Sequence, residues 1–177
     1  MRAHEITDAL AVLLEYPGEG HAARARETLG LLRAQAPDLA RELEPFVEHV
    51  MNVDGREQEE LFTRTFDWAP ERALELGWHL YGEQYERGAF LVRMRDLLRA
   101  HGVEEGQDLP DHLGTLLRLL GRLQPETAAA LCGESLKPAL LRLRAGFGSE
   151  PNPYLALLGA IEAAFPEAPA PAAGGRA

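Results

Sequence analysis

The chain has 177 residues, a length typical of one domain, and 46% of them are apolar, which excludes disorder of the whole chain. Leu and Ala dominate the apolar residues, a composition that favours helix over sheet. The net charge of −10 divides into −7 in residues 1–60, −4 in 61–111 and +1 in 112–177. This excludes nucleic acid and anionic membrane surfaces as partners, because both need a basic footprint. The acidity suits a basic protein segment, although it could equally serve only to keep the protein in solution.

The first half of the chain is predicted to form helices separated by proline and glycine. Apolar residues recur at helical spacing from Ile6 to Leu14, and Tyr16-Pro17-Gly18 ends that helix. Pro37 suits a helix start, where its missing N–H costs nothing, whereas Pro45 is expected to kink or split the same helix. The expected helices are 4–15, 20–35, one beginning at 37, 56–65 and 71–81, with breaks at 52–55 and 66–70.

The second half continues the helical pattern. A helix over 84–101 should end at Gly102, since glycine readily adopts the left-handed conformation found after helix C-termini. Pro110 is expected to open the next helix, with Asp111 and His112 in its first turn. Asn152 should cap the last helix, which begins at 153 and runs to about 165. Between them lies a predicted helix over 125–144, bent near Gly133 or Pro138.

Together these elements predict an all-α fold, a single-domain bundle of about nine helices. The helical domain is expected to span residues 1–165. Residues 166–177 are rich in Pro, Ala and Gly and contain no large apolar side chain, so a disordered tail is predicted there.

The compartment is predicted from the lone cysteine and from two missing signals. Cys132 cannot form an internal disulfide, which fits a reducing compartment. Glu5, Asp8 and Glu15 interrupt the apolar run near the N-terminus, so no signal peptide is predicted. No stretch of about 18 apolar residues is present, so no membrane insertion is predicted either. The expected location is the cytoplasm.

Motifs that would indicate catalysis are absent from the sequence. The six histidines include no pair at the i, i+3 or i, i+4 spacing that places two ligands on one helix face, and no metal site is predicted. Phosphate-binding glycine loops and nucleophile elbows are missing, and Ser135 and Ser149 are the only serines. Cys132 lies in an Ala-rich helix and is interpreted as a packing residue. The chain is therefore predicted to be a binding protein, with no enzymatic activity and no cofactor.

Two clusters stand out as candidate binding elements. The first runs from Leu61 to Trp68 and is followed by Trp78 and Tyr81. Such aromatic density suits a protein-binding patch, although packing between helices is the simpler explanation. The second is Asp108-Leu-Pro-Asp-His-Leu113. A helix-start signal explains its proline and second acid but leaves its histidine unexplained.

At these clusters the sequence resembles the nitrate reductase molybdenum cofactor assembly chaperones, part of the redox-enzyme maturation chaperone superfamily. The resemblance covers about residues 6–165 and departs from the family pattern at Trp68, where polar or aliphatic residues are usual, and at Asp108, where Glu is common. It rests on Leu13-Leu14-Glu15-Tyr16-Pro17, Thr65-Phe66-Asp67, the segment 76–82 ending in Gly, Arg87-Gly88, and residues 108–113.

The resemblance implies a TorD-like all-α fold and a specific client. Such chaperones bind the N-terminal segment of the apo catalytic (alpha) subunit of a membrane-bound nitrate reductase. They hold it in the cytoplasm until molybdenum cofactor and iron–sulfur clusters are inserted, and they are absent from the final complex. For peptide binding we expect an apolar wall of Phe66, Trp78 and Tyr81 with Leu109 and Leu113, and a polar rim of Asp67, Asp111 and His112. Asp108 is also expected to contact the peptide.

Two other functions remain open at this stage. One is a sister chaperone for a molybdoenzyme whose leader carries a twin-arginine motif, although Thr65-Phe66-Asp67 favours the nitrate reductase branch. The other is a small helical enzyme or ligand sensor with a buried pocket, which thermal shifts with small molecules would support. A monomer is expected, with a homodimer formed by helix exchange as the alternative.

Overall fold

The computed structural model of the chain describes residues 3–167, in which helices joined by loops are the regular elements, together with an isolated antiparallel bridge between Glu75 and His112. The all-α prediction is confirmed, while the expected tail lies almost entirely outside the described residues. Two π-helical turns, Thr63–Asp67 and Cys132–Leu136, and a 3₁₀ turn, Pro70–Arg72, interrupt the helices. The helices are α1 (Ala3–Val12), α2 (His21–Gln35), α3 (Pro37–Asn52), α4 (Gly55–Phe62), α5 (Leu76–Tyr81), α6 (Tyr85–Ala100), α7 (Leu113–Leu120), α8 (Pro125–Leu131), α9 (Lys137–Ala145) and α10 (Tyr154–Ala164).

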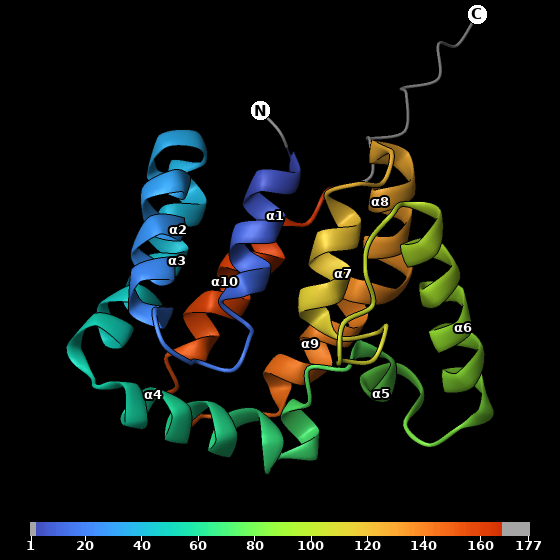
Figure 1. Cartoon of the computed structure of the whole chain (residues 1–177). Coiled ribbons are helices and arrows are strands. Elements are labelled where there is room, and N and C mark those ends of the chain that lie inside the picture. Colours follow the sequence, from blue (N-terminus) through green and yellow to red (C-terminus); the bar gives the residue numbers. More distant parts are fainter. Residues whose placement is uncertain (1–2, 168–177) are drawn as a thin grey trace, which may run out of the picture.

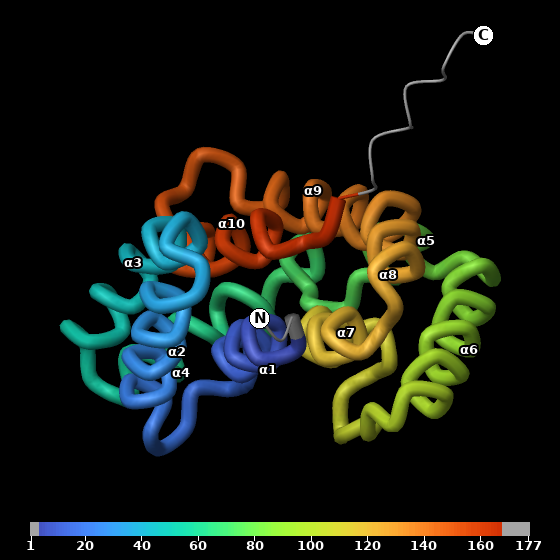
Figure 2. The backbone as a smooth tube through the Cα atoms, turned by 90° about the horizontal axis from the view of Figure 1, so that it is seen from above, coloured from blue at the N-terminus to red at the C-terminus, as the bar shows by residue number. Residues whose placement is uncertain are grey.

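The helices are arranged around a central group made of α1, α7, α9 and α10 (Figures 1 and 2). The α2–α3 pair packs on one side of this group through α10, and α6 lies at the opposite edge. Helix α5 packs against both α6 and α9, whereas α4 runs along one end of the bundle. That end also carries the loop after α1, the segment before α5 and the loop before α7, so four segments of the chain meet there.

An aromatic cluster fixes α4 and the first π turn to the rest of the core. The ring of Phe66 lies 4.8 Å from that of Tyr154 and 5.2 Å from that of Phe62, both in edge-to-face geometry. The ring of Phe46 in α3 also contacts that of Tyr154, with a centroid distance of 5.1 Å. Edge-to-face aromatic pairs contribute about 1 kcal/mol beyond the area that they bury. Phe66 is therefore a core residue, whereas Asp67, which follows it, is exposed.

Several helix boundaries differ from the prediction for identifiable reasons. Helix α3 continues through Pro45 without a split, because Pro45 and Arg41 lie on the exposed face, where the carbonyl that loses its helical donor faces solvent. The irregularity expected near Gly133 is confirmed as a π turn between α8 and α9. Gly102 adopts φ of 65° after α6, as predicted. Asn152 accepts a hydrogen bond from the Tyr154 N–H at 2.9 Å, which confirms its capping role.

In the described part of the chain no helix has both the length and the apolar character needed to cross a membrane.

His21 generates a prediction about acid stability. Its ring is 2% exposed, packs edge-on against Phe46, and has no hydrogen-bond partner for either nitrogen among the described residues. Burial, with a smaller contribution from Arg24, lowers the pKa of His21 from 6.5 to about 4. The unfolded state therefore binds a proton first, so stability should be complete above pH 6.5 and fall as the pH drops towards 4. The loss should reach about 3 kcal/mol.

In urea unfolding at pH 7.0, 5.5 and 4.5, His21→Leu should lose less stability on acidification than the wild-type protein. His101→Gln is the control, since His101 is exposed. Equal losses in wild type and His21→Leu would show that His21 does not set the acid response.

Candidate functional site

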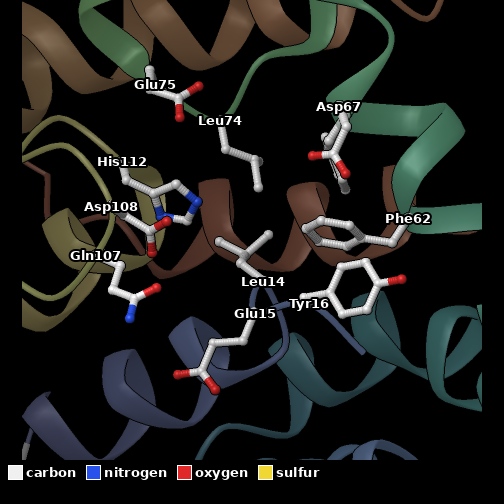
Figure 3. A pocket seen from close by; sticks show the side chains of 11 residues that line it. Leu14, Glu15, Tyr16, Phe62, Asp67, Leu74, Glu75, Gln107, Asp108 and His112 are labelled. Carbon is white, nitrogen blue, oxygen red and sulfur yellow. The ribbon is translucent and has the colours of Figure 1, made fainter. Parts of the chain in front are cut away.

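A cavity of about 630 Å³ opens at the end of the bundle where the four segments meet, and we refer to it as the acidic cavity. In the view of Figure 3, Glu75 and His112 lie on one side, Asp67, Phe62 and Tyr16 on the other, and Leu14 and Leu74 between them. Its lining comes from the loop after α1, from α4 and its π turn, from the segment before α5 and from the loop before α7. The lining residues are Leu14, Glu15, Tyr16, Phe62, Phe66, Asp67, Leu74, Glu75, Gln107, Asp108 and His112.

Carboxylates dominate the polar lining. Glu15, Asp67, Glu75 and Asp108 all face the cavity, and neither Lys nor Arg lines it. Glu15 is paired with Arg118 at 2.5 Å. The other three carboxylates have no ion-pair partner within residues 3–167. Unpaired acids gathered in a concave site focus negative potential, so the cavity suits a cationic group.

The apolar part of the lining consists mostly of residues of the hydrophobic core. Four core residues also line the cavity, namely Leu14, Phe62, Phe66 and Leu74. Tyr16 packs edge-on against Phe62 at 5.5 Å yet remains 53% exposed. A ligand with an apolar stem and a positive end would therefore contact apolar surface and carboxylates at once, as the side chains of arginine and lysine do.

Asp111 is a buried residue that joins the two polypeptide segments carrying Glu75 and His112. Its carboxylate Oδ2 accepts a hydrogen bond from the Gly77 N–H at 3.0 Å and lies 3.7 Å from Nη2 of Arg87. Its backbone carbonyl accepts from the Leu76 N–H at 2.9 Å. Asp111 thus satisfies the first two N–H groups of α5 in the way that a local capping residue usually does. Burial raises the pKa of Asp111, and the nearby Arg87 opposes that shift.

This long-range cap leaves Glu75 available to the acidic cavity. Glu75 occupies the N-cap position of α5 but makes no side-chain capping hydrogen bond. The Glu75–His112 bridge, reinforced by the Leu113 N–H donating to the Leu74 carbonyl at 2.8 Å, holds both residues side by side. His112 in turn caps α7, because its Nδ1 accepts from the Gly114 N–H at 3.1 Å. This hydrogen bond requires an unprotonated Nδ1.

The π turn Thr63–Asp67 sets the direction of Asp67. The Trp68 N–H donates to the Thr63 carbonyl at 3.1 Å, and the Arg72 Nε–H donates to the Thr65 carbonyl at 2.8 Å. These bonds hold the end of the turn while the Phe66 ring anchors its inner face. Asp67 is consequently exposed and faces the cavity from a fixed backbone.

Four of the predicted site residues come together in the acidic cavity: Phe66, Asp67, Asp108 and His112. The other five lie outside its lining. Asp111 and Leu113 are fully buried, Trp78 and Tyr81 are half-buried against Arg87 and Phe90 respectively, and Leu109 is 44% exposed.

The roles expected for the second element therefore need correction. Asp111 does not form a rim, because its carboxylate is buried and accepts a hydrogen bond from the Gly77 N–H. Pro110 does not open a helix, since α7 begins at Leu113 with His112 as its N-cap. Helix α5 is also shorter than predicted, because the chain from Ala73 to Glu75 is extended.

Sequence reasoning missed most of the other lining residues. Leu14, Glu15 and Tyr16 were interpreted as the end of the first helix and as part of a family motif, but not as site residues. Glu75 carried no such signal, because only the contact with residue 112 places it at the cavity. In residues 3–167, no group of three or more His, Cys, Asp and Glu side chains is arranged to hold a metal ion.

Comparisons with known proteins agree with the resemblance of the motifs. The family model described as "Nitrate reductase delta subunit" matches residues 32–158, more than half of the chain. The chain belongs to this family. It is 26% identical over 149 residues to the nitrate reductase molybdenum cofactor assembly chaperone NarJ of Escherichia coli K12, and equally to that of strain O157:H7. These matches cover 82% of this chain but 63% of each relative, so the chain spans less than two thirds of their length.

A solved structure shares the fold. A redox enzyme maturation protein from Archaeoglobus fulgidus superposes with a TM-score of 0.63 at 16% identity, covering 92% of both chains. The predicted redox-enzyme maturation chaperone (TorD-like) fold is thereby confirmed. The two E. coli relatives are named as chaperones rather than enzymes, in line with the expectation of a binding protein.

Gly77 provides a test of the α5 cap. A Cβ atom at this position would lie 2.6 Å from Asp111 Oδ2 and 3.0 Å from Phe90, so a larger residue must displace the carboxylate. Gly77→Ala should lower the free energy of unfolding by about 2 kcal/mol, as overpacking of a core does. Gly88→Ala in α6 is the matched control, because a Cβ there meets nothing within 4 Å. That control should leave stability unchanged or raise it by up to about 1 kcal/mol.

The measurement is chemical denaturation of both variants. If Gly77→Ala proved as stable as Gly88→Ala, α5 could not depend on close approach of Asp111.

Proposed function

We propose that this protein is a cytoplasmic assembly chaperone that binds the N-terminal segment of the apo alpha subunit of a nitrate reductase. It would hold that segment while molybdenum cofactor and iron–sulfur clusters are inserted. Membership of the family and the names of the E. coli relatives support a role in maturation. The observation that carries the binding proposal is the acidic cavity, with three unpaired carboxylates beside an apolar wall.

The acidic cavity is suited to a basic part of a client segment. Asp67, Glu75 and Asp108 reach it from three different segments, so a guanidinium or ammonium group entering it is approached from several sides. Mutual repulsion of the carboxylates is relieved when the cation arrives, which adds to binding. The carboxylates remain partly hydrated, which limits affinity and allows the client to leave once its cofactors are in place.

The cavity charge can be tested with a triple variant, Asp67→Asn, Glu75→Gln and Asp108→Asn. Titration with a synthetic peptide of the alpha-subunit N-terminus should show affinity about tenfold weaker than that of the wild type, since three lost contacts worth about 0.5 kcal/mol each sum to about 1.5 kcal/mol. The loss should shrink at high salt, where exposed charges are screened. Replacing the basic residues of the peptide with Gln should have a similar effect on the wild-type protein.

The matched control is Glu48→Gln, Glu83→Gln and Glu86→Gln. These exposed acids make no ion pair in the described chain and lie outside the acidic cavity, so the control removes the same net charge elsewhere. Equal weakening in both triple variants would assign the effect to the overall charge of the protein. Undiminished affinity in the cavity variant would exclude the cavity as the binding site.

A leader with a twin-arginine motif is the second candidate client. The same three unpaired carboxylates favour it, because they outnumber the single cation that one arginine supplies. Titration with a twin-arginine leader peptide beside the alpha-subunit peptide discriminates between the two. Tighter binding of the leader would assign the protein to the sister branch of chaperones, whereas no saturable binding of either peptide would refute the chaperone proposal.

A further inference from the structure

A second hollow of about 450 Å³ adjoins the acidic cavity and shares Tyr16 with it. We refer to it as the tryptophan hollow. Its lining comes from the exposed face of α4, from the π turn and from Trp68. The lining residues are Tyr16, Arg56, Glu59, Glu60, Thr63, Arg64 and Trp68.

Trp68 is the most informative residue of this hollow. Its side chain is 76% exposed. The two residues before it differ, since Phe66 is buried in the core and Asp67 lines the acidic cavity. The backbone beneath it is held by the Thr63 carbonyl, so the indole is presented from a rigid position. An indole left in water contributes little to folding, whereas Trp is among the residues that dominate binding energy at interfaces.

The charges around the tryptophan hollow differ from those of the acidic cavity. Arg56 and Glu60 form an ion pair at 3.0 Å, and Glu59 and Arg64 add one charge of each sign. The rim is therefore electrically balanced and offers no net attraction to a cation. Trp68 and Tyr16 both supply exposed aromatic surface to the hollow. This arrangement suits an apolar side chain, surrounded by charges that can meet the polar backbone of a peptide.

We propose that the tryptophan hollow is a second peptide subsite, which takes a leucine or phenylalanine of the same client segment whose basic residue enters the acidic cavity. The inference rests on the proposed function. Tyr16 forms a wall of both hollows, so a segment bound in one passes directly to the other. The protein would then recognise a pair of residues, one basic and one apolar, rather than charge alone. Residues three, four or seven positions apart on a helix share one face and could meet both subsites.

The test uses the full chain carrying Trp78→Phe, in which Trp68 is the only tryptophan. The probes are synthetic peptides with one Arg and a Leu placed three, four or seven positions away, and the same peptides with Leu replaced by Ala. At one spacing the Leu peptide should bind about tenfold more tightly than its Ala counterpart, as expected of an interface hot spot. Binding should shift the Trp68 emission to shorter wavelength as the indole leaves water.

Adding Trp68→Ala to this protein should abolish the advantage of Leu over Ala and leave the affinity of the Ala peptides unchanged. Tyr85→Ala is the matched control, because Tyr85 is 91% exposed and lies in neither hollow. Thermal unfolding of each variant checks that it is folded.

The outcomes separate the two proposals. If Arg-containing peptides bind but Leu brings no gain at any spacing, or Trp68 emission does not change at saturation, the second subsite is refuted and the acidic cavity stands. If neither these peptides nor the alpha-subunit N-terminal peptide binds the wild-type chain, both proposals are refuted.

Discussion

The site depends on the capping of α5 by the buried residue Asp111. Asp111 lies between the start of α5 and the start of α7. Its carboxylate accepts a hydrogen bond from the Gly77 N–H, and its backbone carbonyl accepts one from the Leu76 N–H. A buried charge is costly unless it is paired and hydrogen-bonded, and Arg87 at 3.7 Å supplies the opposite charge. Because Asp111 takes over the capping of α5, Glu75 is released to the acidic cavity and the backbone bridge sets His112 beside it.

The acidic cavity concentrates like charge at one end of the bundle, in a protein that is already strongly acidic. Only Glu15 among its four carboxylates is neutralised within the described structure, by Arg118. Such a cluster opposes folding through repulsion and is retained only where a rigid scaffold enforces it. Here the scaffold consists of the aromatic cluster around Phe66 and the Asp111 cap, and both hold backbone rather than the acidic side chains themselves. The carboxylates of the proposed client surface are thus separate from the contacts that stabilise the fold, whereas Phe62 and Phe66 belong to both.

Much of the fold could be predicted because its signals are local. Asn152 caps α10 and Gly102 follows α6, and each depends only on its own neighbours in sequence. Pro110 was misleading, because the carboxylate that follows it caps a helix 34 residues earlier and not its own. The same limit applies to the site. Asp67, Asp108 and His112 were found through their motifs, whereas Glu75 depends on a tertiary contact that leaves no trace in the local pattern.

The central claim is that a client segment binds at the end of the bundle, in the acidic cavity, and not on another face. The groove between α6 and α8, with a volume of about 590 Å³ and the exposed Val92 at its edge, is the main structural alternative. Backbone amide chemical shifts, followed by nuclear magnetic resonance as the alpha-subunit peptide is added, distinguish the two directly. We expect the largest shifts at Tyr16, Asp67, Glu75 and His112. Shifts confined to residues 89–100 and 127–134, with those four amides unchanged, would contradict the account.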